Sequence, residues 1–164
     1  MEYKVVQEML NQRGYKITEK SENRYIATKD NDTLLVIFSE YTKLNIDSIK
    51  THLKIVNELG FKHVIIIYNN LITASAKKVI NHLINIKIEI FSKSELEFNI
   101  TKHRLSKPHI KLTGKYAQDI KKKYGKNLPI ILESDPQSRF YGFSKGDIIK
   151  IIRKNGLISY RIVK

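Results

Sequence analysis

Two uninterrupted apolar runs in the first half of the chain constrain its fold more than any other feature. Residues 34–38 read LLVIF, and the strand-like segment 61–68 reads FKHVIIIY. A run without polar alternation is typical of a strand that is buried on both faces, as in sheets covered by helices. The runs therefore predict an α/β layer with a partly parallel sheet.

Helical spacing and end signals predict the other elements of residues 1–95. The first is a helix that ends at Gly14 and has the apolar face Val5, Val6, Met9 and Leu10. Strands over 24–28 and 33–39 follow, and then a helix that is capped by Asp47 and ends at Gly60. The remaining elements are the strand over 61–68, a helix from Thr73 or Ser75 to about Ile84, and a strand over 86–91.

The end of the chain predicts a β-hairpin. Two apolar strands, at 147–153 and 157–163, flank Asn-Gly at 155–156. Asn-Gly tolerates the positive φ angles of a type I′ turn, so a two-residue loop should pair Ile151 with Tyr160. The first strand is apolar on both faces, which favours a central place in its sheet.

Charge is distributed unevenly along the chain. The net charge is +14; residues 1–98 carry 14 Lys/Arg against 12 Asp/Glu, an excess of +2, and residues 99–164 carry 16 against 4, an excess of +12. With a very basic helix expected at 114–124, this asymmetry predicts two domains, the second facing nucleic acid or an acidic protein surface. Lys outnumbers Arg 24 to 6, a bias that an AT-rich genome also produces, so a merely solvated face is the alternative.

Several classes of protein are excluded or disfavoured. The chain has no cysteine, which excludes disulfides and thiolate zinc sites and fits an intracellular protein. No apolar run approaches the roughly 18 residues of a membrane span. The first ten residues carry acids among their apolar positions, so they do not form a signal peptide.

A search for chemistry finds no convincing catalytic set. A metal-dependent nuclease needs two acids and a Lys at strand ends, but the Glu/Asp-x-Lys elements lie at 2–4 and 119–121, away from the predicted central strands. His103 and His109 lack a nearby acid or thiol for zinc, so packing or hydrogen bonding is the expected role. No Gly-rich phosphate loop or nucleophile elbow occurs. We therefore predict no catalytic residue, no metal site and no cofactor.

Aromatic rings stand beside basic residues at 121–124 and at 139–141. A base-stacking platform requires exposed rings on a flat face. Because both segments adjoin apolar strands, we expect these rings to belong to the core.

The stretch SDPQSRFYGFSKGD, at 134–147, is predicted to be a structural joint rather than a ligand loop. Asp135 and Pro136 suit the N-cap and first residue of a short helix, and Gly142 can end it with a positive φ. One of the aromatic residues after Arg139 should pack on the sheet. Arg139 has two candidate roles, holding an acidic group within the domain or reaching a partner.

The last third of the chain resembles a known family. Its motifs are Leu-Pro at 128–129, Asp-Pro at 135–136, Tyr-Gly at 141–142, Gly146 followed by Ile-Lys-Ile at 149–151 and by Arg153, and Tyr-Arg at 160–161. These spacings closely resemble the C-terminal assembly domain of the fifth subunit of eukaryotic RNA polymerases, a domain that in archaeal RNA polymerases stands alone as a small separate protein. The resemblance implies a signature and subunit interface made of Asp135, Pro136, Arg139, Tyr141, Gly142, Gly146, Lys150, Arg153, Tyr160 and Arg161.

The first part resembles the jaw domain of the eukaryotic and large-DNA-virus versions of that subunit, in segments 7–15 and 65–80, with the interdomain connection at 98–112. The resemblance implies a nuclease-like fold without catalysis. The family's Thr-Pro-Ser-Ala element, near downstream DNA, reads TASA at 73–76 here. The candidate DNA contacts are Thr73, Ser75, Lys77 and Lys78. The jaw is also short, which suggests a large DNA virus as the source.

The expected fold is thus α/β plus α+β: a nuclease-like jaw domain over 1–98 and a small mixed-sheet assembly domain over 99–164 that ends in a β-hairpin. The resemblance implies a non-catalytic subunit of a multisubunit DNA-directed RNA polymerase. Its expected partners are the largest subunit and other subunits, downstream DNA and candidate transcription factors, with no membrane. It would work inside the cell, in the nucleus if cellular and in host cytoplasm or virion if viral. The alternative is an independent basic DNA- or RNA-binding protein.

Overall fold

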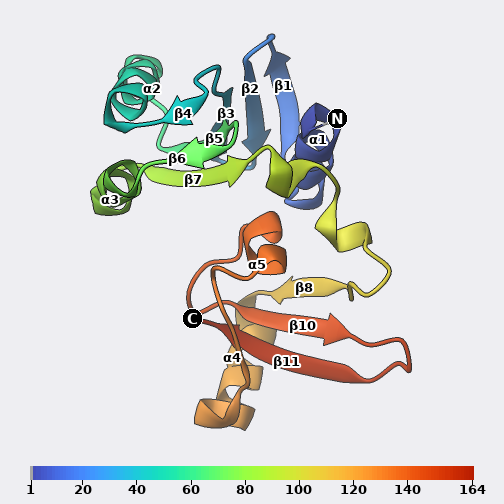
Figure 1. Cartoon of the computed structure of the whole chain (residues 1–164). Helices are drawn as coiled ribbons and strands as arrows, with labels where there is room; N and C mark the ends of the chain where they lie inside the picture. The colour runs from blue at the N-terminus through green and yellow to red at the C-terminus, as the bar shows by residue number, and fades with distance from the viewer. Residues whose placement is uncertain (1) are drawn as a thin grey trace. The chain divides into compact units, whose positions relative to one another are not determined.

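A computed structural model describes residues 2–164 and divides into two compact units, one ending at Phe98 and the other spanning Asn99–Lys164 (Figure 1). Both units combine helices with β-sheets, so the described chain is a mixed α/β protein with several sheets. Each unit is described by itself below.

The N-terminal unit is built on a five-stranded sheet with the order β1-β2-β3-β5-β7. Strands β1, β2 and β3 pair antiparallel, and β3, β5 and β7 pair parallel. The bounds are β1 Lys16–Lys20, β2 Arg24–Lys29, β3 Asp32–Phe38, β5 His63–Tyr68 and β7 Lys87–Ser92. The predicted partly parallel sheet is therefore confirmed, with the apolar runs as its central strands.

Helices cover both faces of this sheet, which explains why the runs lack polar alternation. Helices α2 (Ile46–Leu59) and α3 (Ala74–His82) pack on the face of Leu35 and Ile66. Helix α1 (Glu2–Gln12) lies on the other face, where the Tyr3 ring meets that of Phe38 at a centroid distance of 4.5 Å. The predicted apolar face of α1 is confirmed, because Val5, Val6, Met9 and Leu10 are all buried.

Three details of this unit differ from the sequence prediction. The N-cap of α2 is Asn45, whose Oδ1 accepts from the Ser48 backbone N–H at 2.8 Å, so Asp47 lies inside the first turn instead. Strand β1 was not predicted, because four of its five residues are exposed and give no apolar periodicity. The small parallel pair β4 (Lys43–Leu44) and β6 (Leu71–Ile72) was also not predicted. A 3-10 turn, Ser94–Leu96, follows β7.

The C-terminal unit has a four-stranded mixed sheet with the order β8-β10-β11-β9. Strand β10 pairs antiparallel with β8 and β11, and β11 pairs parallel with β9. The bounds are β8 His109–Leu112, β9 Ile130–Ile131, β10 Ile148–Ile152 and β11 Ile158–Val163. The predicted central position of the Ile-rich strand is confirmed.

A helix packs on each face of this sheet. Helix α4 (Gly114–Tyr124) covers the face of Ile148, through Ile120. On the face of Ile149 and Ile151, the ring of Tyr141, the last residue of helix α5 (Pro136–Tyr141), joins the core cluster. Short 3-10 turns at Ile100–Lys102 and Gly125–Asn127 complete the unit.

The predicted register of the hairpin is wrong by one residue. Ile151 pairs with Ser159, and Lys150 pairs with Tyr160. The N–H of Arg153 donates to the Leu157 carbonyl, which closes a loop over residues 154–156. Only Gly156 has a positive φ in this loop, +77°. Such geometry is typical of a three-residue loop with a glycine bulge, not of a type I′ turn.

The predicted joint at 134–147 is confirmed. Asp135 caps α5 by accepting from the Gln137 N–H at 2.8 Å, Pro136 is its first residue, and Gly142 ends it with a φ of +69°. Phe140 is buried, and Tyr141 packs on the sheet in a stack with Phe143.

Candidate functional site

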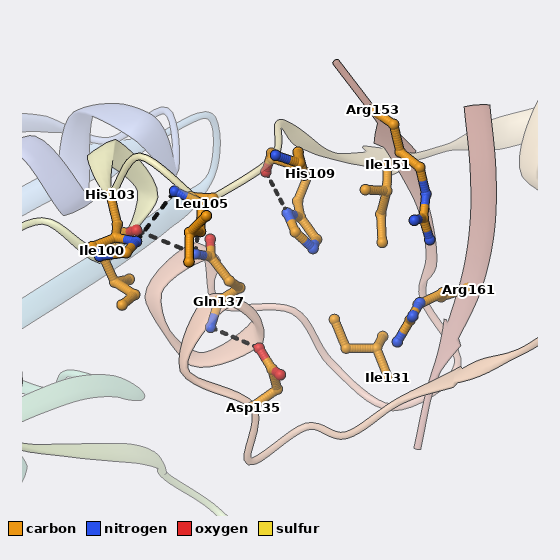
Figure 2. A pocket seen from close by; sticks show the side chains of 12 residues that line it. Ile100, His103, Leu105, His109, Ile131, Asp135, Gln137, Ile151, Arg153 and Arg161 are labelled. Atoms are coloured by element: carbon orange, nitrogen blue, oxygen red, sulfur yellow. Dashed lines mark hydrogen bonds between the residues drawn. The ribbon is translucent and has the colours of Figure 1, made fainter. Parts of the chain in front are cut away.

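A hollow of about 400 Å³ opens on the α5 face of the C-terminal sheet (Figure 2). Basic and histidine side chains line much of its wall, and aliphatic side chains form the rest. The lining residues are His103, Lys107, His109, Arg153 and Arg161; Ile100, Leu105, Ile131 and Ile151; and Ser106, Asp135 and Gln137. With the histidines neutral, three cations against one carboxylate leave a charge of +2 at this site.

Strand alternation brings the two arginines to this face. Residues 149, 151 and 153 of the first hairpin strand point to one side, and residues 159, 161 and 163 of its partner point to the same side. Arg153 and Arg161 therefore stand over the buried Ile149–Ile151 face, and Figure 2 shows both guanidinium groups directed into the hollow. The Arg161 guanidinium makes one long hydrogen bond, 3.4 Å to the Ile130 carbonyl.

Gln137 ties the segment before β8 to α5. Its Nε2 donates to the Ile100 carbonyl at 3.2 Å and to Ser106 Oγ at 2.9 Å. Hydrogen bonds from α5 therefore hold the segment of Ile100 and Ser106, which forms one wall of the hollow, in a fixed position.

The two histidines make local hydrogen bonds, as expected. The Nδ1 of His109 lies 2.6 Å from the Lys107 carbonyl. Because a carbonyl can only accept a hydrogen bond, Nδ1 must carry the proton. The other ring nitrogen, Nε2, points into the hollow (Figure 2). His103 Nδ1 accepts from the Leu105 N–H at 3.3 Å. Among the side chains of residues 3–164, no group of three or more His, Asp or Glu is arranged to hold a metal ion.

The structure divides the sequence signature into two sets. Asp135, Arg153 and Arg161 meet at the hollow, and the Tyr141 ring lies beside it, 6.3 Å from the ring of His109. The others are not brought to the hollow. Pro136, Gly142 and Gly146 shape the backbone, the last with a φ of +91°. Lys150 and Tyr160 pair with each other on the opposite, α4 face of the sheet. The backbone of Arg139 makes hydrogen bonds within α5 and its C-cap.

The α4 face carries a cluster of three tyrosines, Tyr116, Tyr124 and Tyr160. Tyr124 was expected to be core but is 38% exposed, so that expectation is wrong for Tyr124 although right for Phe140; Tyr116 is also exposed, at 48%. The hydroxyls of Tyr116 and Tyr160 are 2.8 Å apart, and this hydrogen bond, with a smaller effect of burial, raises the pKa of Tyr160 to about 12.

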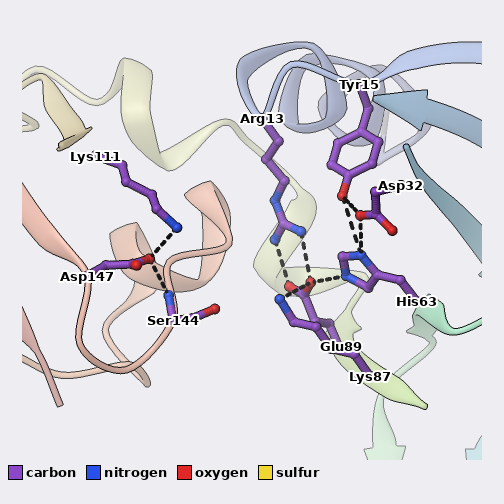
Figure 3. A network of polar contacts seen from close by, with 9 residues as sticks. All are labelled: Arg13, Tyr15, Asp32, His63, Lys87, Glu89, Lys111, Ser144 and Asp147. Carbon is purple, nitrogen blue, oxygen red and sulfur yellow. Dashed lines mark hydrogen bonds and ion pairs between the residues drawn. The ribbon is translucent and has the colours of Figure 1, made fainter. Parts of the chain in front are cut away.

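The N-terminal unit contains a polar network that sequence reasoning missed (Figure 3). Arg13 donates to both Glu89 oxygens, at 3.0 and 2.8 Å. His63 places Nε2 2.8 Å from Glu89 Oε1 and Nδ1 3.2 Å from Asp32 Oδ2. The Tyr15 hydroxyl donates to the same Asp32 oxygen. The only sequence signal is a polar residue inside apolar strands, as in Ile88-Glu89-Ile90.

The charges of this network compensate one another. Burial acts to raise the pKa of Glu89, but the Arg13 charge and the His63 hydrogen bond outweigh it and hold that pKa well below its usual range. Burial opposes the shift of Asp32 too, yet hydrogen bonds from Tyr15 and His63 lower its pKa. Burial first, and then the hydrogen bond to Asp32, raise the pKa of Tyr15. Each carboxylate already has protein partners, so this network is a structural ion-pair cluster.

A separate ion pair occurs in the C-terminal unit, between Lys111 and Asp147 at 2.8 Å (Figure 3). Asp147 Oδ2 also accepts from the Ser144 N–H at 2.9 Å. Asp147 therefore fixes the turn that leads into β10.

The candidate DNA contacts lie at the start of α3. Thr73 is its N-cap, with Oγ1 accepting from the Ala76 N–H at 3.1 Å, and Ser75 Oγ lies 3.3 Å from Thr73 Oγ1. Lys77 and Lys78 are exposed in the next turn. The helix begins with Ala at position 74, so the loss of the family's proline does not prevent the cap. No helix within residues 2–164 has the length and apolar character of a membrane span.

Comparisons with known proteins place both units in one family. The family model described as RNA polymerase Rpb5, C-terminal domain, matches residues 98–163. The putative DNA-directed RNA polymerase subunit 454R of Invertebrate iridescent virus 6 is 32% identical over 180 positions, covering 99% of this chain and 97% of the relative. The subunit rpabc1 of DNA-directed RNA polymerases I, II and III of Dictyostelium discoideum is 30% identical over 184 positions, covering 97% and 93%. The chain therefore belongs to the Rpb5 family, as a component of a DNA-directed RNA polymerase and not an enzyme by itself.

Proposed function

We propose that the C-terminal unit is the assembly domain, which docks on the largest polymerase subunit, and that the N-terminal unit is the jaw, which extends towards downstream DNA. The observation that most supports the docking role is the convergence of Asp135, Arg153 and Arg161 on one hollow. These residues come from the N-cap of α5 and from the hairpin, and they belong to the same family signature. The relatives named as polymerase subunits support the class of partner.

Charge supports the same division of roles. Of the four acids of residues 99–164, Asp135 caps α5 and Asp147 pairs with Lys111, so most of the +12 excess is left to face a partner or solvent. Acidic surfaces on other polymerase subunits would complement this positive charge. The near-neutral jaw would contact DNA phosphates at few points, with Thr73, Ser75, Lys77 and Lys78 as candidates.

The site of action follows the polymerase. The compartments that we propose are the nucleus for a cellular source and host cytoplasm or virion for a viral one, and both stay open because relatives occur in an iridescent virus and in a cellular organism. Transcription factors are further candidate partners of the jaw.

Affinity purification of the full chain from expressing cells tests the proposal. The largest polymerase subunit should co-purify, and it should stay bound after nuclease treatment. The competing hypothesis, an independent nucleic-acid-binding protein, predicts tight DNA binding by the chain alone that falls by about 0.9 log units per phosphate contact with each log unit of salt. Retention of DNA without any polymerase subunit would exclude the proposed role.

The DNA contact needs its own test. In assembled polymerase, the double variant Lys77→Glu/Lys78→Glu should shorten the lifetime of elongation complexes under salt challenge, because two phosphate-facing charges are reversed. Lys50→Glu/Lys54→Glu, on the exposed side of α2, makes the same change of charge elsewhere in the unit. Equal effects of the two double variants would argue against a DNA contact at the start of α3.

A further inference from the structure

The hollow on the α5 face has the chemistry of a peptide-binding site. We propose that it receives an extended segment of a partner protein in which a Glu or Asp side chain stands next to an apolar one. This inference rests on the proposed docking function and specifies the chemistry of the segment that docks.

The carboxylate is the group that Arg153 and Arg161 can bind. The two guanidinium groups enter the hollow from adjacent strands (Figure 2). Neither forms an ion pair with a carboxylate of residues 3–164, and the hydrogen bond of Arg161 to Ile130 is long, 3.4 Å. Arginine binds carboxylates with two parallel hydrogen bonds, and such charge-assisted bonds are stronger than neutral ones.

The apolar neighbour is the group that the floor can hold. Ile131 and Ile151 belong to the core of the sheet and face the hollow, and Leu105 is 65% exposed at its rim. An apolar side chain of the partner would cover Leu105 and contact the two isoleucines. Removal of that apolar surface from water favours binding.

His109 favours a peptide over a simple anion. Its Nδ1 donates to the Lys107 carbonyl, so the neutral ring can only accept at Nε2, which faces the hollow. A backbone N–H of a bound peptide can donate to this nitrogen, whereas a simple anion has no N–H to offer.

Nucleic acid fits the hollow less well. The aliphatic floor offers nothing to a phosphate backbone. The volume of about 400 Å³ suits one or two side chains rather than a strand of nucleotides. The two exposed tyrosine rings described in this unit, those of Tyr116 and Tyr124, lie on the α4 face instead.

NMR titration of the isotope-labelled full chain with short blocked peptides tests the inference. The probes are hexapeptides of alternating Glu and Leu, of Gln and Leu, of Lys and Leu, and of Glu and Ser. The Glu/Leu peptide should bind saturably and shift the signals of Ile131, Ile151 and His109. Peptides that lack either the carboxylate or the apolar side chain should bind at least about tenfold more weakly.

Charge reversal supplies the matched controls. Arg153→Glu and Arg161→Glu should each weaken binding of the Glu/Leu peptide about tenfold or more, whereas Lys122→Glu, an equal charge change on α4, should not. Retained signals of Ile149 in each variant establish that the unit is folded. Equal weakening by Lys122→Glu, equal binding of the Lys/Leu peptide, absence of saturable binding, or displacement of the peptide by short single-stranded RNA would each overturn the inference.

The same variants separate this inference from the proposed function. If wild-type chain does not co-purify with the largest subunit, the docking function fails whatever the peptides do. If wild-type chain and Arg153→Glu/Arg161→Glu co-purify with it equally, docking stands and the assignment to this hollow fails.

Discussion

Removing Arg13 should destabilise the N-terminal unit strongly, because it leaves a buried carboxylate without its main partner. The Arg13 and Glu89 side chains are only 4% and 16% exposed and are joined at 2.8 Å. After Arg13→Leu, Glu89 keeps His63 at 2.8 Å and Lys87 at 3.9 Å. Breaking one side of a buried ion pair costs about 3–5 kcal/mol. Since His63 remains, we expect a loss of about 3 kcal/mol in the free energy of unfolding, at the lower end of that range.

Urea unfolding of the full chain, followed by methyl NMR, measures this loss for each unit separately. Signals of Ile66 report on the N-terminal sheet and those of Ile149 on the C-terminal sheet. Arg24→Leu, at an exposed arginine of β2, is the matched control and should cost less than about 0.5 kcal/mol. A loss below about 1 kcal/mol at Ile66 for Arg13→Leu would refute the reasoning.

The double variant Arg13→Leu/Glu89→Gln tests the cause of the loss. The amide carries no charge and keeps an oxygen for His63, so no buried charge is left without a partner. It should recover more than half of the stability lost in Arg13→Leu. A double variant as unstable as the sum of its single changes would show that lost packing, not the unpaired charge, is responsible.

The loss of stability in Arg13→Leu should depend on pH, and the lowered pKa of Glu89 gives the direction. Arg13 and His63 overcome the effect of burial and hold the pKa of Glu89 below its ordinary value of 4.5. A lowered folded-state pKa contributes stability that is complete above the unfolded-state pKa and is lost as pH falls from there through the folded-state value. The difference between wild type and Arg13→Leu should therefore be largest at neutral pH and narrow below about pH 4.5.

Three further changes test local features. Gly156→Val should lower the free energy of unfolding, measured in urea melts, by about 1–2 kcal/mol, because a φ of +77° is strained for a β-branched residue. An added Cβ would have no atom within 4 Å, so the loss comes from the backbone alone, and Gly156→Asn should lose less. Asn45→Ala should cost about 1 kcal/mol through loss of the α2 cap, whereas Asp47→Asn should have little effect. Tyr116→Phe should lower the pKa of Tyr160 from about 12 towards its ordinary value of 10.0, measured by NMR titration of labelled tyrosine rings; an unchanged value would exclude the hydrogen bond as its cause.

Sequence reasoning succeeded where the physical cause is local. The apolar runs at 34–38 and 61–68 became central strands because lack of alternation directly reflects burial on both faces. The joint at 134–147 followed from the backbone preferences of Asp, Pro and Gly. These signals act within a few residues and need no knowledge of the rest of the fold.

It failed where two local solutions use the same residues. Asn45 and Asp47 are both good caps two positions apart, and only the path of the chain decided for Asn45. Asn-Gly suits a type I′ turn and also a longer loop with a glycine bulge, and here Asn155 Oδ1 accepts from the Leu157 N–H at 3.3 Å in the latter. One extra loop residue then shifts every cross-strand pair of the hairpin.

The network around Glu89 could not be predicted, because its partners come together only in the folded sheet. Arg13 and Glu89 are 76 positions apart in the sequence. The search for nuclease chemistry examined Glu/Asp-x-Lys spacings, which are local, and so could not find a cluster built from one helix end and three strands.

The signature of the C-terminal unit combines residues with a clear structural role and residues whose charges have no ion-pair partner in the described chain. Gly142 and Gly146 adopt positive φ, and Asp135 caps α5, so each has a sufficient structural role. The backbone of Arg153 closes the hairpin loop, but any residue could donate that N–H. Its guanidinium has no ion-pair partner within the described chain, and that of Arg161 has only the long bond to Ile130. The contacts within the unit therefore do not explain these two charges, and recognition of a partner is the role that we propose for them.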